Sequence, residues 1–245
     1  MYQFFVEPSQ IQGNKIIITG SDVNHMKNVL RMKTGEEIAV KNGVDGKEYR
    51  CGIEEFTQDQ VVCSLRFIRE EGVELPSEIY LFQGIPKADK MEWIVQKAVE
   101  LGVYEIIPVA VKRCVVKLDE KKAQAKVNRW QGIAEAAAKQ CKRGKIPVVR
   151  PPMSMKEAAA YAAKTDIKLI PYELAKDMAR TREKIEAIRP GQSVAVFIGP
   201  EGGFEESEVE TALDAGIEPI TLGKRILRTE TAGLTVLSWL MYHLE

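Results

Sequence analysis

A glycine-rich turn near the C-terminus is the segment whose residue types most clearly suggest ligand chemistry. It lies in VAVFIGPEGGFEESEVETALDAG, residues 194–216, where an apolar β-branched run ends at GPEGG and apolar residues at helical spacing follow. Backbone N–H groups at the start of a helix can bind phosphate. The turn has no P-loop lysine, however, and the glutamates around it oppose a phosphate group. Two interpretations stay open: a well-capped strand-to-helix turn, or a pocket for a cationic or hydroxyl-rich ligand.

A second loop, in LGKRILRTETAGLTVLSWLMYHL, carries two apolar residues between basic ones. We expect a strand to end at Leu222-Gly223 and Thr229 to cap the helix that follows. Ile226 and Leu227 favour a wall for a flat ring, and the alternative is that both pack under the last helix. That helix is apolar on most of its surface, which predicts deep burial or a subunit interface. Its uncharged stretch is shorter than the ~20 residues that span a bilayer.

The elements that must position these loops follow an alternating pattern from residue 79 onward. Strand-like runs alternate with amphipathic helices, which predicts βα units around a parallel sheet. The strands are expected at residues 79–85, 105–111, 147–150, 167–172, 194–198 and 218–222. Because ligands bind outside the carboxyl ends of parallel strands, the loops after Tyr172, Ile198 and Leu222 are candidates for one pocket.

Residues 1–70 show a different pattern, in which short β-rich runs are separated by Asn-Gly and Asp-Gly turn signals. This pattern is typical of a small β meander or barrel. One helix interrupts it, with Ser21 as the expected N-cap and Gly35 as the end. The apolar face of this helix is expected to consist of Val23, Met26, Val29 and Leu30. The polar stretch 71–78 is the expected linker to a second domain over residues 79–245.

Basic residues are unevenly distributed along a chain with 35 Lys and Arg against 35 Asp and Glu. Residues 112–145 hold eleven Lys and Arg against three acids, which predicts a positive face. Lysine and arginine side chains on helices can contact RNA phosphates. The residues predicted to do so are Lys27, Arg31, Lys139, Lys142 and Arg143. The alternative for each of these helices is a solvated face.

The cysteines and the N-terminal residues indicate the cellular compartment in which the protein is expected. The four cysteines show no C-x-x-C spacing, and the chain has two histidines, so we expect no metal centre and a reduced, cytoplasmic location. The N-terminal residues MYQFFVEPSQ lack a basic stretch followed by an apolar run, so no signal peptide is expected.

The two C-terminal motifs together carry a resemblance to a known family. IGPEGGF followed by LGKRILRTETA, preceded by PKADKMEWIVQKAVELGV and AEAAAKQCKR, resembles the RsmE family of 16S rRNA uridine N3-methyltransferases of the SPOUT class. The segment HMKNVLRMKTGEEIAVKNG is similar to the PUA-like RNA-binding domain of that family, so the resemblance covers the chain from end to end. One departure is Gln3, where many relatives carry an arginine, so no RNA contact is assigned there.

The resemblance implies a fold, a cofactor and partners. The fold would be a trefoil-knotted α/β SPOUT methyltransferase domain over residues 79–245, preceded by a small PUA-like β-barrel domain over residues 1–70. The methyl donor would be S-adenosyl-L-methionine and the acceptor N3 of a uridine in 16S rRNA, either free or within the assembled small subunit. The protein would be a homodimer with no membrane partner. The alternative is an RNA-binding SPOUT-like protein that acts on a different RNA nucleotide.

The resemblance also assigns site residues. The expected cofactor-binding residues are Tyr172, Glu173, Ile198, Gly199, Pro200, Glu201, Gly202, Gly203, Leu222, Gly223, Ile226, Leu227 and Arg228. A sulfonium cation tolerates a glutamate-rich surround that would repel a triphosphate. Uracil N3 carries a proton at neutral pH, so the reaction needs a proton acceptor and a group that stabilises the resulting anion. We expect Arg228 to stabilise the anion and Glu230 to accept the proton; the alternative for Glu230 is an interaction with the helix dipole.

Overall fold

The computed structural model describes residues 1–70, 72–114, 119–173 and 175–245, and it divides the chain into two compact units. The first unit comprises Met1–Glu74 and Ala138–Ile146, and the second comprises Leu75–Ala137 and Pro147–Glu245. The division near residue 74 falls inside the predicted linker. Residues 138–146, which are the end of a long helix and the turn after it, group with the first unit, although they lie within the domain expected over residues 79–245. A continuous helical pattern gives no signal of such a division.

The first unit contains a six-stranded sheet in the order β1-β4-β5-β6-β3-β2. All neighbouring strands are antiparallel except β1 and β4. The strands are β1 (Gln3–Phe5), β2 (Ile11–Gln12), β3 (Lys15–Thr19), β4 (Glu37–Lys41), β5 (Glu48–Phe56) and β6 (Gln60–Arg69), and a 3-10 helix, η1, covers Pro8–Gln10. The strand interiors bury one apolar cluster that includes Phe4, Ile16, Ile18, Ile38 and Val61. This unit is therefore the small β domain that the turn signals predicted.

The helix of the first unit is shorter and wider than its sequence predicts. It begins as α1 (Ser21–Asn24) and continues as a π-helical turn, η2 (His25–Val29), in which the N–H of Leu30 donates to the oxygen of His25. Gly20 occupies the N-cap position, so the predicted N-cap role of Ser21 is wrong. Val29 is 62% exposed and does not join the core, because the extra residue in a π turn shifts the side chains that follow.

The second unit is built on a parallel sheet in the order β10-β8-β7-β12-β11-β13, with β9 also paired to β8. Every pair of neighbouring strands is parallel, which confirms the predicted parallel α/β fold. The strands are β7 (Glu78–Gly84), β8 (Glu105–Ala110), β9 (Val148–Val149), β10 (Met153–Ser154), β11 (Ile167–Pro171), β12 (Ser193–Ile198) and β13 (Glu218–Ile220). The helices are α2 (Lys90–Glu100), α3 (Glu120–Gln140), α4 (Met155–Ala162), α5 (Met178–Glu186), α6 (Glu206–Asp214) and α7 (Thr229–Leu244).

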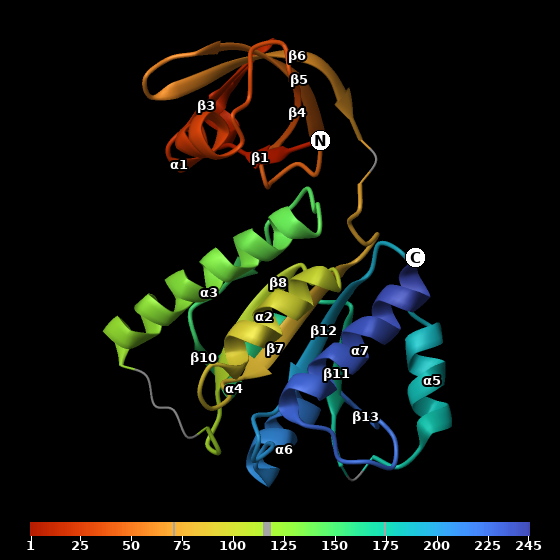
Figure 1. Cartoon of the computed structure of the whole chain (residues 1–245). Coiled ribbons are helices and arrows are strands. Elements are labelled where there is room, and N and C mark those ends of the chain that lie inside the picture. The colour runs from red at the N-terminus through yellow and green to blue at the C-terminus, as the bar shows by residue number, and fades with distance from the viewer. Residues whose placement is uncertain (71, 115–118, 174) are drawn as a thin grey trace. The chain divides into compact units, whose positions relative to one another are not determined.

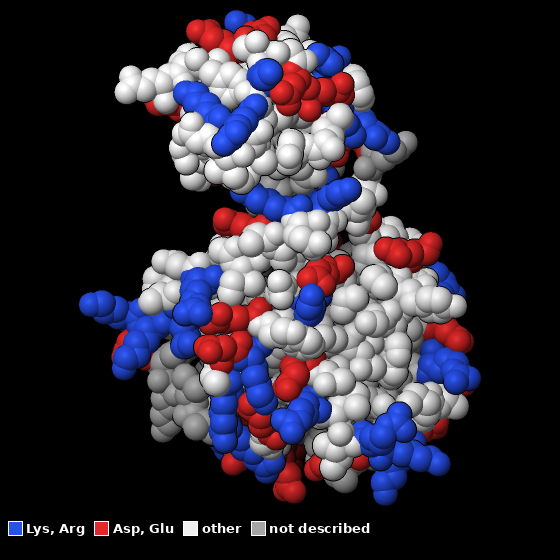
Figure 2. Space-filling view, in the orientation of Figure 1, with Lys and Arg blue, Asp and Glu red and all other residues white. Residues whose placement is uncertain are grey.

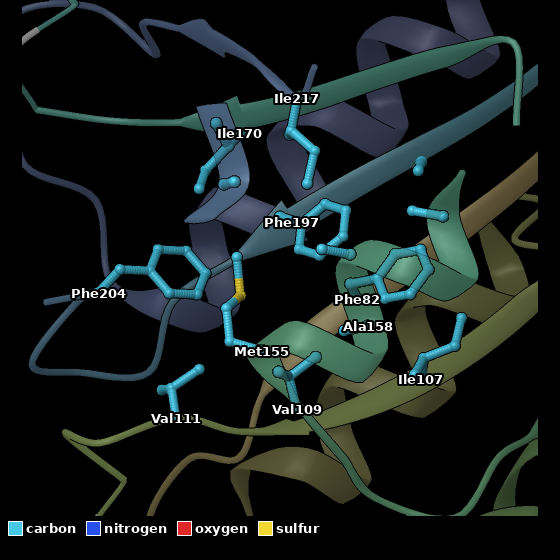
Figure 3. Close-up of a cluster of buried hydrophobic side chains, with 14 of the residues drawn as sticks. Phe82, Ile107, Val109, Val111, Met155, Ala158, Ile170, Phe197, Phe204 and Ile217 are labelled. Carbon is cyan, nitrogen blue, oxygen red and sulfur yellow. The ribbon is translucent and has the colours of Figure 1, made fainter. Parts of the chain in front are cut away.

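The two faces of this sheet are covered by different helices. Figure 3 shows the core on the face covered by α4 and α6, where the rings of Phe82 and Phe197 are stacked 4.3 Å apart. On the opposite face, α2 and α7 lie across the strands (Figure 1). Helix α7 packs against these strands at Gly233, where a Cβ would be in ordinary van der Waals contact with the side chains of Gln83 and Ile198. Within the described residues, no helix has both the length and the apolar character needed to cross a membrane.

Candidate active site

The loops that follow β12, β11 and β13 meet at one edge of the parallel sheet, because these three strands are neighbours with the same direction. Two hydrogen bonds join the segments that follow β11 and β13. The N–H of Tyr172 donates to the oxygen of Ile220 at 3.0 Å, and the N–H of Thr221 donates to the Oγ1 of Thr181 at 3.0 Å. The half-buried Tyr172 therefore lies beside the end of β13, while Glu173 after it is exposed.

The turn of residues 199–203, here called the glycine turn, is held by close contacts between backbone atoms. The N–H of Gly203 donates to the oxygen of Pro200 at 2.9 Å. A Cβ on Gly199 would lie 3.0 Å from the Cα of Gly203, and Gly203 itself has φ +67. On the next strand, a Cβ on Gly84 would lie 2.5 Å from the Cδ of Pro200. The turn thus requires a glycine on β7, which the sequence analysis did not identify.

Arg113, which follows β8, supports the glycine turn from the other side. Its Nη1 donates to the oxygen of Gly202 at 2.9 Å, and its Cβ lies 3.2 Å from the position that a Cβ on Gly202 would take. In sequence, Arg113 is one of many basic residues between 112 and 145. Only the parallel topology, which places β8 beside β7 and β7 beside β12, shows that it contacts this turn.

A buried chain of hydrogen bonds joins β7, α7 and the glycine turn. Thr229 donates its hydroxyl hydrogen to the oxygen of Gly199 at 2.6 Å and accepts from the Nε2 of Gln83 at 2.9 Å. The expected cap role of Thr229 is wrong, because Arg228 is the N-cap and Thr229 is the first residue of α7. Gln83 is fully buried, and a glutamine inside the apolar run IYLFQGI was a sequence signal for such a role.

The loop of residues 222–228 before α7, here called the pre-helix loop, is largely exposed. Gly223 has φ +103, and Leu222 and Leu227 are half-buried. Ile226 is 93% exposed, so it does not pack under the last helix, and the alternative interpretation is wrong for this residue. Among the described residues the guanidinium of Arg228 has no partner, while its backbone oxygen accepts from the N–H of Ala232 at 2.8 Å. Its side chain is therefore available to a substrate.

Two of the predicted site carboxylates, Glu201 and Glu230, meet at Lys90. The Nζ of Lys90 lies 2.9 Å from the Oε1 of Glu201 and 3.4 Å from the Oε2 of Glu230. The backbone N–H of Lys87 also donates to Glu201. Although burial raises the pKa of Glu201, the hydrogen bonds from Lys90 and from backbone N–H groups outweigh it, and its pKa lies below the ordinary value. The Glu201 carboxylate is thus engaged within the protein.

The predicted RNA contacts all lie in the first unit and differ in how available they are. The ammonium of Lys27 donates to the backbone oxygens of Thr57 and Gln58, at 3.3 Å for the latter. Arg31 and Lys142 are exposed, and both have a positive φ, of 52° and 63°. Lys139 lies over the ring of Phe5 at 5.7 Å and 3.9 Å from Asp22.

Arg143 is not available to RNA. Its side chain is only 5% exposed, and its Nη2 lies 2.6 Å from a carboxylate oxygen of Glu74. The same carboxylate accepts from the N–H groups of Gly144 and Lys145. Arg143 therefore holds the turn after α3 within the first unit, and this burial is incompatible with the predicted phosphate contact.

The first half of α3 presents further basic side chains in the second unit. Figure 2 shows Lys and Arg side chains on the left, where Figure 1 places the start of α3. Lys121, Lys122 and Arg129 are exposed there, and Arg129 is paired with Glu92 of α2 at 2.8 Å. All three lie within residues 112–145, the basic segment that predicted a positive face.

Comparisons with known proteins agree with this geometry. The RNA methyltransferase domain family matches residues 73–241, and the RNA methyltransferase PUA domain family matches residues 18–65. The chain is 37% identical to ribosomal RNA small subunit methyltransferase E of Bacillus subtilis over 100% of this chain and 98% of the relative. It is 33% identical to the enzyme of the same name from Mesomycoplasma hyopneumoniae, over 97% of this chain and 98% of the relative.

Two solved structures have the same fold over nearly the whole chain. A putative methyltransferase from Legionella pneumophila, in complex with the cofactor SAM, has a TM-score of 0.84 and 35% identity and covers 98% of this chain and 96% of its own. Ribosomal RNA small subunit methyltransferase E from Neisseria gonorrhoeae, bound to S-adenosyl methionine, has a TM-score of 0.82 and 32% identity, with coverage of 97% and 95%. The chain therefore belongs to the RNA methyltransferase family of these enzymes, with a PUA domain before an α/β methyltransferase domain.

Proposed function

We propose that this protein is an S-adenosylmethionine-dependent rRNA methyltransferase that modifies N3 of a uridine in the small-subunit rRNA. The observation that carries the proposal is the bond of 2.6 Å between Thr229 and Gly199, which places the available Arg228 next to the glycine turn. The full-length relatives named for small-subunit rRNA methylation, and the SAM-bound neighbours, support the same function.

The residues of the site fit S-adenosylmethionine. Apart from Gly203 itself and its two neighbours in the chain, no atom of the described residues lies within 4 Å of the position that a Cβ on Gly203 would take, so a ligand can reach the backbone of the glycine turn there. The half-buried Leu222 and Leu227 offer apolar surface for a purine, and the turn offers backbone groups for a ribose. When bound, the cofactor supplies an electrophilic methyl group on a sulfonium cation.

The side chains of this chain then provide the acid–base chemistry. Loss of the N3 proton spreads negative charge over N3 and the two carbonyl oxygens of uracil, and Arg228 can present its planar guanidinium to that charge. Glu230, in the first turn of α7, accepts the proton. Its carboxylate is held 3.4 Å from the ammonium of Lys90.

Several further features belong to this proposal. The trefoil knot enters the proposal through the resemblance of the two C-terminal motifs to the SPOUT class, and the parallel α/β sheet is of the kind that this class would have. A homodimer is supported by the apolar α7, on which Tyr242 is 87% exposed. RNA binding is assigned to the first unit through Lys27, Arg31, Lys139 and Lys142, and the location is the cytoplasm, where 16S rRNA is made.

The test is methylation of purified RNA by the purified protein. Labelled S-adenosylmethionine is supplied with either free 16S rRNA or assembled small subunits, and the product nucleoside is identified by mass spectrometry. We expect N3-methyluridine at a single position. A different methylated nucleoside would support the alternative, an enzyme of the same class that acts on another nucleotide, and no methyl transfer to either RNA would contradict the proposed function.

A further inference from the structure

Lys90 contacts acidic side chains from two separate parts of the proposed site. It is the first residue of α2, while Glu201 belongs to the glycine turn and Glu230 to the first turn of α7. We propose that Lys90 is a positioning residue that holds Glu230 and the glycine turn in one arrangement for the reaction. The inference rests on the proposed function, because it assigns Lys90 its effect through Glu230.

The loop between β7 and α2 is folded so that two of its donors reach Glu201. The N–H of Lys87 lies 3.2 and 3.3 Å from the two carboxylate oxygens, and the ammonium of Lys90 lies 2.9 Å from one of them. Ala88, between these two residues, has φ +55, a conformation that is unfavourable for a residue with a side chain. Strained backbone of this kind persists where surrounding contacts hold it and is common at functional sites.

The second carboxylate that Lys90 contacts is that of Glu230, the proposed proton acceptor. The Oε2 of Glu230 is buried and forms no hydrogen bond with any described residue, and the ammonium of Lys90 is 3.4 Å away. A buried acceptor that lacks a hydrogen bond is rare and calls for an explanation. The ion pair with Lys90 provides one, because the ammonium supplies the charge that keeps this carboxylate in its buried position.

Removal of the Lys90 ammonium would therefore change the position of the Glu230 side chain. Without the ammonium, Glu201 and Glu230 would be two carboxylates near one another, with one oxygen buried and unpaired. The favoured response is for Glu230 to turn toward solvent. The hydrogen bond to Glu201 raises the pKa of Lys90, so the ammonium is charged throughout the range in which the enzyme would work.

The test is a double-mutant cycle on single-turnover methylation with Lys90→Met, Glu230→Gln and the double variant. We expect each single change to lower the rate on the order of 10-fold to 100-fold, as misplacement of a reacting group does. The double variant should be no slower than the slower single variant, because both changes remove the same contribution. Lys90→Arg, which keeps the charge, should restore most of the rate with little change in KM.

Lys97→Met is the matched control, because Lys97 lies on the same helix and pairs only with Glu100 of its own last turn, at 2.8 Å, among the described residues. It should keep the parent's rate. Full additivity of the two losses, or an unchanged rate in Lys90→Met, would overturn the positioning role. So would a Glu230→Gln variant that is as fast as the parent while Lys90→Met is slow.

A second double-mutant cycle, measured by urea unfolding of the parent, the two single variants and the double variant, tests the contact without a measurement of activity. Non-additive shifts of the urea midpoint are expected, because Lys90 and Glu230 are in contact. If the parent methylates neither free rRNA nor assembled subunits, the proposed function fails, and the unfolding cycle still tests the contact. Midpoint shifts that add in full would then overturn the inference by themselves.

Discussion

The hydroxyl group of Thr229 donates to the backbone oxygen of Gly199 across 2.6 Å, and this single bond joins the start of α7 to the end of β12. The residues on either side of Thr229 are the two that we assign to the chemistry, Arg228 and Glu230. The glycine on the other side of the bond opens the turn that we assign to the cofactor. The position of the reacting groups relative to the cofactor therefore depends on a buried hydroxyl group.

Replacement of Thr229 by valine tests this dependence. Valine keeps the shape of the side chain but removes the donor to the oxygen of Gly199 and one of the two acceptors of the Gln83 amide, which still donates to the oxygen of Gly84. We expect a loss of about 1–3 kcal/mol in the free energy of unfolding, which is the cost of unsatisfied buried groups. We also expect weaker binding of S-adenosylmethionine, measured by isothermal titration.

Thr235→Val is the control for this change. Thr235 lies on the same helix, and within the described part of the chain its hydroxyl group bonds only to the oxygen of Thr231, one turn earlier. Its loss should leave cofactor affinity unchanged. Equal effects of the two valine substitutions on that affinity would show that the bond from Thr229 to Gly199 does not position the glycine turn.

Gly84→Ala should disturb the glycine turn from β7. The added Cβ would lie 2.5 Å from the Cδ and 2.7 Å from the backbone nitrogen of Pro200, so the turn must shift. We expect a destabilisation of about 1–3 kcal/mol, as for other overpacked sites, together with a lower affinity for S-adenosylmethionine. Urea unfolding and isothermal titration measure the two effects.

Gly132→Ala is the matched control for an added methyl group. Gly132 is exposed in the middle of α3, and a Cβ there would meet no described atom within 4 Å. It should stabilise the protein by about 0.5–1 kcal/mol through helix propensity and leave cofactor binding unchanged. A Gly84→Ala variant that binds the cofactor as tightly as Gly132→Ala would contradict the role assigned to the turn.

The sequence predicted those features that depend on local pattern. The parallel sheet follows from runs of apolar residues with helices between them, and the glycine turn follows from its composition. Gln83, Gly84, Lys90 and Arg113 were not identified, because each acts on a segment that is distant in sequence and adjacent only through the strand order. The exposure of Val29 was missed for another reason, since a π-helical turn is a backbone irregularity that side-chain spacing does not encode.

The basic residues after α3 show how burial divides a charged run into two roles. Lys142→Ala should weaken RNA binding and lower the salt dependence by about one unit of slope, if its exposed ammonium contacts one phosphate. Arg143→Ala should instead destabilise the protein by about 1.5–3 kcal/mol, because it removes the buried cation that hydrogen-bonds the half-buried carboxylate of Glu74. Filter binding over a salt series and urea unfolding distinguish the two effects. A folded Arg143→Ala variant with full stability and a lower salt slope would reverse the assignment.

The reaction itself can be tested through the proton on uracil N3. If removal of that proton limits the rate, single-turnover methylation should accelerate as pH rises, because the reactive anion becomes more abundant. Arg228→Lys keeps the positive charge but loses the planar guanidinium, so we expect a rate loss on the order of 10²-fold, as for a removed oxyanion donor, with RNA affinity nearly intact. Arg225→Lys, a change of the same kind at an exposed residue of the pre-helix loop, should have little effect. Glu230→Gln should be slowest relative to the parent at low pH and closest to it at high pH, where the base is no longer needed. A rate that does not vary with pH and is insensitive to both the Arg228 and the Glu230 substitutions, in proteins that still bind RNA and cofactor, would show that this loop only binds the methyl donor.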